Sequence, residues 1–154
     1  MGDLEGRVAL VTGGGRGIGV AIARDLAGRG AEVVVSSRTK ADLDAVVESI
    51  ASEGGSAISR PTDAMDREQV RALGKFTLDQ FGRIDILVNN VGGASSVAPG
   101  SEYDLDDAFL AGLTLNLVSA VWLSHSLLPS MREAICPTGA SVEEYAEASH
   151  EHAA

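Results

Sequence analysis

The residues with the clearest chemical signal are glycines spaced for a phosphate-binding turn. The run from Thr12 to Gly19, TGGGRGIG, follows a short apolar segment and precedes a helical pattern. Glycines at positions 13, 17 and 19 allow a tight turn, close approach of a pyrophosphate, and close packing of the helix on the strand. The helix N-terminus offers unpaired N–H groups and partial positive charge to phosphates. A merely flexible loop is the alternative, but the strand–turn–helix context favours a dinucleotide site, and no Gly-Lys-Ser/Thr follows that would indicate an ATP-type P-loop.

Two arginines indicate which dinucleotide this site prefers. NAD-binding proteins place a carboxylate at the end of the second strand, whereas the 2′-phosphate of NADP is repelled by a carboxylate and pairs with arginine. Here the second apolar segment ends with Ser36-Ser37-Arg38, and the next acid, Asp42, lies inside the following helix. Arg16, in the glycine run, is placed to approach the same phosphate. The pattern predicts NADP rather than NAD; the alternative is that Arg38 is a solvated surface residue.

Other polar residues give weaker signals. Ser95 and Ser96 have no histidine nearby in the sequence, so a nucleophile is not expected there. His125 lies among apolar neighbours in a helical pattern and is expected to pack or to lie at an interface. The histidines at 150 and 152 belong to a tail in which such residues are usually solvated, and Cys136 has no activating partner. No metal site is predicted.

Apolar runs predict the strands that must position these residues. Four short runs, 8–11, 33–35, 57–59 and 84–88, indicate strands buried in a parallel sheet. The last of them is too apolar to be half exposed. Because helical patterns separate the runs, we expect right-handed βαβ units with helices on both faces of the sheet.

Apolar stripes at helical spacing predict the helices between the strands. The first stripe runs from Ile18 to Leu26. Thr39 with Asp42 resembles a capping box for the second helix, and Asp66 with Gln69 starts the third. A long helical pattern then begins at about Asp104 and continues to residue 128, where proline 129 is expected to perturb its end. That helix is predicted to expose an apolar face and to favour self-association through Leu113, Leu117, Val121 and Leu128.

These elements predict the fold class and the domain limits. The fold class is α/β, a Rossmann-type doubly wound parallel sheet that is truncated after about the fourth strand and the following long helix. Residues 1–134 are expected to form a partial NAD(P)-binding domain. Residues 135–154 are mostly Ala, Ser, Glu and His, and are expected to be a disordered or aberrant tail, because such a composition cannot offset the entropy of ordering.

Composition excludes several classes of partner. The 154 residues carry a net charge of −10, which repels nucleic-acid phosphates and anionic lipid surfaces. The single cysteine excludes an internal disulfide, and the first residues show no signal-peptide pattern. No apolar stretch reaches roughly 18 residues, so no membrane span is expected. The expected location is cytoplasmic, without nucleic-acid or membrane partners.

Together the motifs resemble the short-chain dehydrogenase/reductase family over about residues 4–133. The resemblance rests on the glycine run, on Asn89-Asn90-Val91-Gly92 after the fourth strand, on Asp63 after the third, and on Asn116 in the long helix. It is similar to 3-oxoacyl-reductase-like members. Val91 departs from the alanine that is usual in the family. A methyltransferase with a similar sheet is the alternative, but it would not explain the asparagine pair or Asn116.

The resemblance implies a role for each matching position. The glycine run would wrap the pyrophosphate and the adenosine ribose, Asp63 with the Ala64 backbone would meet the adenine, and Asn90 would lie along the cofactor. Asn116 matches the asparagine of the catalytic tetrad, which holds a water in the proton relay; the alternative is a helix residue bonded to a backbone carbonyl. The expected cofactor-binding residues are Gly13, Gly15, Arg16, Gly17, Ile18, Gly19, Arg38, Asp63, Ala64, Asn90, Val91 and Gly92.

The same resemblance shows what the sequence lacks. In this family a tyrosine exchanges a proton with the substrate oxygen, a lysine four residues later lowers the pKa of that tyrosine, and an upstream serine orients the carbonyl. Tyr103 and Tyr145 have no lysine four positions later, and the stretch after Ala134 does not read as the next strand. A truncation or reading-frame shift near residue 133 is our interpretation of this break.

Two functions follow from these expectations. The first is an inactive, cofactor-binding fragment of an NADP-dependent oxidoreductase that acts on a small-molecule alcohol or ketone. The second is a non-catalytic nucleotide-binding or regulatory module that associates with a complete relative through the long helix. The sequence does not indicate which substrate a complete relative uses.

Overall fold

The structure, a computed structural model, describes residues 2–93 and 105–135. Its strands are β1 Val8–Thr12, β2 Glu32–Ser37, β3 Ser56–Pro61 and β4 Ile86–Val88. Its helices are α1 Gly17–Gly28, α2 Lys40–Ser52, α3 Arg67–Phe81, α4 Leu105–Leu113, the π-helical segment η1 Thr114–Val118, and α5 Ser119–Ile135. Strands and helices alternate as the sequence predicts, from β1 through β4.

The four strands form one parallel sheet in the order β3-β2-β1-β4. β1 lies in the middle, where Leu10 is paired with Val34 of β2 on one side and with Leu87 of β4 on the other. After β3, at one edge of the sheet, the chain therefore crosses to the other side of β1, where β4 lies. This is the α/β, Rossmann-type architecture that the sequence predicts.

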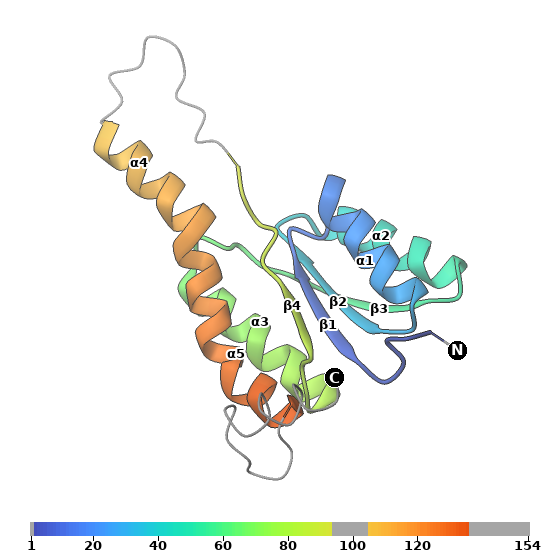
Figure 1. The fold of residues 1–154 in the computed structure, drawn as a ribbon. Coiled ribbons are helices and arrows are strands. Elements are labelled where there is room, and N and C mark those ends of the chain that lie inside the picture. The colour runs from blue at the N-terminus through green and yellow to red at the C-terminus, as the bar shows by residue number, and fades with distance from the viewer. Residues whose placement is uncertain (1, 94–104, 136–154) are drawn as a thin grey trace, which may run out of the picture.

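Helices cover both faces of the sheet, with α1 and α2 on one side and α3 and α5 on the other (Figure 1). Side chains of β1 alternate between the two layers. Ala9 and Val11 pack with Leu26 of α1 and Leu43 of α2, whereas Leu10 packs against the α3 and α5 side. A buried apolar core on each face therefore holds the sheet in place, and with it the residues at the ends of the strands.

The helix starts show which local signals decide the structure. Asp66 caps α3 as predicted, since its Oδ1 accepts hydrogen bonds from the backbone N–H groups of Glu68 and Gln69, at 2.9 and 3.1 Å. Thr39 is the residue before α2, but its side chain makes no capping hydrogen bond. The predicted capping box is therefore wrong, and Asp42 instead accepts a hydrogen bond from Arg16.

Three further expectations need correction. Ile18 is 74% exposed, so the first stripe does not bury its leading residue; Ala23 and Ala27 are buried instead. β4 is three residues long and half-buried rather than fully buried, because it pairs with β1 alone in the described part of the chain. Pro129 does not end the long helix, which continues to Ile135.

The long helix is continuous from α4 through η1 to α5, and α4 extends away from the sheet (Figure 1). α5 contributes Leu123 and Leu127 to the core on the α3 side. Six large apolar side chains of the long helix are exposed, and the four predicted from the sequence are among them: Phe109, Leu110, Leu113, Leu117, Val121 and Leu128. The exposed face is thus confirmed, and self-association through it stays a prediction.

By length and composition, the run Asp107–Ala134 is apolar enough to cross a membrane, with a mean hydropathy of 1.4. The sequence expectation missed this, because charged and polar residues interrupt the apolar stretches. The run also packs against α3 and the sheet through Leu123 and Leu127, and 17% of its most apolar 18-residue stretch is buried.

Candidate functional site

A cleft of about 450 Å³ opens at the carboxyl ends of the strands. This is where parallel α/β sheets bind ligands, and the volume suits a small organic molecule or cofactor. Apart from Gly17 and Gly19, every predicted cofactor residue lines the cleft. Its lining is Gly13, Gly15, Arg16, Ile18, Ser37, Arg38, Thr39, Asp42, Thr62, Asp63, Ala64, Asn90, Val91, Gly92 and Leu115.

The glycine run forms the turn between β1 and α1 on one side of the cleft. Gly13 has φ +65°, a backbone conformation that favours glycine. A Cβ on Gly19 would collide with the carbonyl oxygen of Gly13 and would lie 2.7 Å from Nδ2 of Asn90. The first turn of α1 therefore lies directly against the loop, and Ile18 of that turn lines the cleft.

Asn90 holds this turn from the other side. Its Nδ2 donates to the carbonyl oxygens of Thr12 and Gly13, at 3.2 and 3.3 Å. The preceding residue, Asn89, donates from Nδ2 to the Ser124 hydroxyl on α5 at 3.1 Å. The asparagine pair thus ties the end of β4 to both the glycine turn and the long helix, which agrees with a steadying role for this segment.

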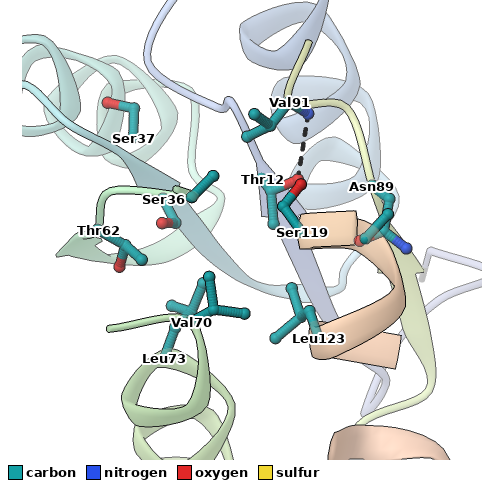
Figure 2. A pocket seen from close by; sticks show the side chains of 12 residues that line it. Thr12, Ser36, Ser37, Thr62, Val70, Leu73, Asn89, Val91, Ser119 and Leu123 are labelled. Atoms are coloured by element: carbon teal, nitrogen blue, oxygen red, sulfur yellow. Dashed lines mark hydrogen bonds between the residues drawn. The ribbon is translucent and has the colours of Figure 1, made fainter. Parts of the chain in front are cut away.

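The hydroxyl of Thr12 joins the ends of β1 and β4. Its Oγ1 accepts from the backbone N–H groups of Asn90 and Val91, at 3.1 and 3.3 Å, and donates to the carbonyl of Val88 at 3.3 Å. Figure 2 shows the bond from Val91. The sequence marked Thr12 only as the first residue of the glycine run, since nothing in local spacing reveals a partner so far along the chain.

Two arginines line the part of the cleft beside β2. Nε of Arg16 donates to Oδ2 of Asp42 at 2.7 Å, and the Arg16 side chain is 79% exposed. The hydrogen bond to Asp42, and then the charge of that carboxylate, raise the pKa of Arg16 above its ordinary value. Arg38 lies in the same lining, directly after β2. This end of the cleft is suited to an anion.

Asp63 and Ala64 lie at the far end, after β3. The backbone N–H of Asp63 donates to Oε1 of Gln69 at 2.9 Å, and its Oδ1 accepts from the backbone N–H of Met65 at 2.9 Å. The turn is therefore fixed from α3. Both residues of this turn line the cleft, and their contact with an adenine stays a prediction.

A smaller cavity of about 20 Å³ lies beside the cleft (Figure 2). The two share four lining residues, Ser37, Thr62, Ala64 and Val91. Buried apolar residues of α3 and α5 form its floor. In the described part of the chain, Oγ of Ser37 is the one buried side-chain oxygen or nitrogen with no hydrogen-bond partner. The oxygen of Ser37 points away from the other side chains of the cavity and toward Gly15 of the glycine turn (Figure 2).

Asn116 lies in η1, and both ends of its amide are bonded to backbone. Its Oδ1 accepts from the N–H of Gly93 at 2.9 Å, while its Nδ2 donates to the carbonyls of Gly93 and Gly112, at 3.0 and 2.7 Å. This fits the structural alternative given above. A π-helical segment at this residue is also a feature that recurs at functional sites.

Several expectations fall elsewhere. His125 is exposed on α5 and does not pack in the core. Ser95, Ser96, Cys136, both tyrosines, the histidines at 150 and 152, and the proposed tail beyond Ile135 lie outside the described residues. Within residues 2–93 and 105–135, no group of three or more His, Cys, Asp or Glu side chains is placed to hold a metal ion.

The sequence missed five residues of the cleft lining. Thr62 and Leu115 are next to the predicted Asp63 and Asn116, so proximity in sequence is a usable signal. Thr39 and Asp42 were assigned to a helix cap, and that assignment hid them. The missed residues are Ser37, Thr39, Asp42, Thr62 and Leu115.

Comparison with known proteins agrees with this geometry. Residues 7–138 match the family described as short chain dehydrogenase. The chain belongs to the short-chain dehydrogenase family. The match confirms the family that the sequence motifs indicated, which is a family of oxidoreductases.

Individual relatives give the same assignment. An uncharacterised oxidoreductase of Mycobacterium tuberculosis is 40% identical over 86% of this chain and 50% of its own length. A metagenomic short-chain oxidoreductase solved with NADP is 37% identical, with a TM-score of 0.77 over 85% of this chain and 59% of its own. A 7α-hydroxysteroid dehydrogenase solved with NADH and a 7-oxo bile acid is 35% identical, with a TM-score of 0.78 over 86% of this chain and 51% of its own. The chain spans half or less of the length of the curated relatives it matches.

Proposed function

We propose that this chain is the NADP-binding part of a short-chain dehydrogenase that acts on a small-molecule alcohol or carbonyl. The single observation that carries the cofactor preference is the pair Arg16 and Arg38 in the cleft lining beside the end of β2. The carboxylate nearest to them, Asp42, is engaged by Arg16 rather than placed at the strand end. Two guanidinium groups attract the 2′-phosphate of NADP, which the ribose of NAD lacks.

The cleft fits such a cofactor in several places. A Cβ on Gly13, Gly15 or Gly19 would collide with neighbouring atoms, so this turn needs glycine at three positions, and the start of α1 would offer its N–H groups to a pyrophosphate. Asp63 and Ala64 would meet the adenine, and Asn90, Val91 and Gly92 would follow the cofactor toward the long helix. One structural neighbour was solved with NADP and another with NADH, so the preference has to be measured on this chain.

The nicotinamide cofactor would supply a hydride when bound, and this chain's residues would position it. Carbonyl reduction also needs a group that donates a proton to the developing alkoxide. The 154 residues contain no Tyr-x-x-x-Lys. Asn116 is the matching tetrad position, and an amide holds water but is no acid. We therefore propose that this chain binds cofactor without turning over substrate by itself.

Fluorescence titration with NADPH and NADH tests the proposal. Wild type should bind NADPH more tightly, and Arg38→Asp should reduce or reverse that preference. Loss of a charge-assisted phosphate contact costs about 1.5–3 kcal/mol, which corresponds to a change of at least about tenfold. Arg71→Asp on α3, which removes a charge from an exposed surface pair with Glu68, is the matched control.

The outcomes are distinct. Equal affinity of wild type for both nucleotides would show that Arg38 is a surface residue, and a preference that Arg71→Asp alters as much would attribute it to overall charge. In the same preparation, NADPH oxidation should be absent with ketones, aldehydes and 3-oxoacyl thioesters. Turnover near one per second, lost in Asn116→Ala, would contradict the proposed lack of activity.

A second candidate is a non-catalytic nucleotide-binding module that associates with a complete relative. The exposed apolar row of the long helix, which includes Leu113, Leu117, Val121 and Leu128, favours it. Sedimentation should then show concentration-dependent association that Leu117→Ser with Val121→Ser removes. A chain that stays monomeric at high concentration and binds no relative would exclude this function.

A further inference from the structure

The ion pair between Arg16 and Asp42 joins two neighbouring elements that line the same part of the cleft. Arg16 precedes α1 in the glycine turn, and Asp42 lies in the first turn of α2. Nε of Arg16 is 2.7 Å from Oδ2 of Asp42, and both residues line the cleft together with Arg38. The contact is therefore placed at the end of the cleft where the two cations gather.

The two partners are not equally free to move. The Asp42 side chain is 24% exposed, against 79% for Arg16. α2 is anchored by the fully buried Leu43, and a Cβ on Gly15 would lie 3.4 Å from Cβ of Asp42, so the carboxylate is packed against the glycine turn. Asp42 is the fixed member of the pair, and Arg16 is the member that it holds.

Arg16 binds Asp42 with one edge of its guanidinium, which leaves the other edge for a ligand. Arginine carries N–H donors on Nε and on two Nη atoms, arranged in a rigid plane. Arg16 uses Nε toward Asp42, and among residues 2–93 and 105–135 its Nη atoms make no hydrogen bond. An anion can therefore bind the outer, two-nitrogen edge without breaking the ion pair, since the two edges of one guanidinium serve two partners.

We infer that Asp42 is a positioning residue for cofactor selection: it holds Arg16 so that its Nη edge receives the 2′-phosphate of NADP. This inference rests on the proposed NADP site and deepens it. Asp42 touches neither the phosphate nor the reacting atoms; it acts through Arg16. Arg38 is the second cation of the same phosphate position.

A carboxylate near a phosphate also repels it. Whether Asp42 strengthens or weakens NADPH binding therefore depends on the balance between this repulsion and its effect on Arg16. Arg16 neutralises Asp42, and Arg38 remains as a net positive charge beside the position. Removal of the Asp42 charge would lessen the repulsion, but it would release a long and largely exposed side chain into many rotamers. NADPH would then have to order that side chain on binding, and ordering a flexible arginine is costly. The positioning effect outweighs the repulsion, so Asp42→Asn weakens NADPH binding.

NADPH and NADH titrations of wild type, Asp42→Asn, Asp42→Glu, Arg16→Gln and the Arg16→Gln/Asp42→Asn pair test the inference. Asp42→Asn should raise the Kd of NADPH about fivefold and leave that of NADH within about twofold, because only NADPH needs an ordered Arg16. In the Arg16→Gln background the same substitution should no longer weaken NADPH binding and should tighten it slightly, since a positioning residue has nothing left to position and only its repulsion of the phosphate is removed. Asp42→Glu, which keeps a carboxylate, should recover part of the loss.

Asp44→Asn is the matched control, because it removes the same charge from the same helix and breaks an exposed pair with Lys40. The NADPH/NADH ratio should not change in this variant. An unchanged or tighter NADPH Kd in Asp42→Asn, an equal loss for NADH, or an equal loss in Asp44→Asn would each overturn the positioning role. If Arg38→Asp changes the preference and Asp42→Asn does not, only this inference fails. If wild type has no preference, the proposed NADP site fails and this inference fails with it.

Discussion

The two ends of the sheet use polar residues in opposite ways. At the amino end, Asp85 accepts hydrogen bonds from the backbone N–H of Val8 at 2.9 Å, from Arg7, and from Arg83 through both Nε and Nη2. Its side chain is 6% exposed. At the carboxyl end, the Arg16 side chain is largely exposed and Oγ of Ser37 is buried without a partner in the described part of the chain.

This contrast separates stability from binding. A carboxylate whose bonds are all made within the chain contributes to folding and has nothing left for a ligand. Hydrogen-bond donors and cations without a partner beside a cleft do not stabilise the fold, and a buried one destabilises it. Their role is to bind a ligand that supplies the missing acceptor or negative charge. Thr12 is the exception at the cleft end, because its hydroxyl is fully used in joining β1 to β4.

Gly19→Ala should have the largest effect and should reduce both stability and binding. At Gly19 both depend on the same close contact between α1 and the glycine turn. The new Cβ would collide with the Gly13 carbonyl and lie 2.7 Å from Nδ2 of Asn90. Overpacking against backbone forces the loop to shift, so we expect a loss of about 3 kcal/mol in the free energy of unfolding and no measurable NADPH binding. Urea unfolding and fluorescence titration measure the two effects.

Gly28→Ala is the control, since it lies at the end of the same helix and a Cβ there meets nothing within 4 Å. It should leave NADPH affinity unchanged and should be neutral or stabilising, by up to about 1 kcal/mol. If Gly19→Ala bound NADPH like wild type, close approach of α1 to the turn would not be a requirement of the site.

The same contrast explains what the sequence could predict. Strands, the glycine turn and the Asp66 cap are local: each is encoded by neighbours in the sequence, and each is present in the structure. The end-of-strand positions of Asn90 and Asp63 follow from the same alternation, because the carboxyl ends of parallel strands meet at one edge. Much of the cleft could therefore be predicted before any coordinates.

Most of the errors concern contacts between distant parts of the chain. Ile18 has the spacing of a buried residue but lies at the mouth of the cleft, and β4 is apolar yet half-buried because it has a single neighbour in the described sheet. Asp42 was assigned to Thr39, three residues away, whereas its partner is Arg16 in the glycine turn, 26 residues away. Pro129 is tolerated inside α5, where it lies on the exposed side. Periodicity reports local conformation and gives no information on such partners.

Asp85→Asn tests the amino end of the sheet. It should lower the free energy of unfolding by less than Gly19→Ala does and leave NADPH binding unchanged. Burial acts to raise the pKa of Asp85, but the hydrogen bonds from Arg83, Val8 and Arg7 together outweigh it and lower the pKa to about 2, from an ordinary 3.8. A difference of this size corresponds to about 2 kcal/mol of stability at neutral pH. We expect Asp85→Asn to lose about that amount at pH 7 while the NADPH Kd stays within about twofold, because the residue is at the opposite end of the sheet from the cleft.

The dependence on pH distinguishes this charge effect from a general packing defect. Because the folded-state pKa is lowered, the stabilisation is fully present above the unfolded value of 3.8 and is lost as the pH falls toward 2. The difference between wild type and Asp85→Asn should therefore shrink between pH 4 and pH 2, as measured by urea unfolding at each pH. Asp79→Asn, which breaks an exposed pair with Lys75, should cost less than about 0.5 kcal/mol throughout. A difference for Asp85→Asn that stayed constant down to pH 2 would assign its effect to shape rather than charge, and a matching loss of NADPH affinity would show that the two ends of the sheet are not independent.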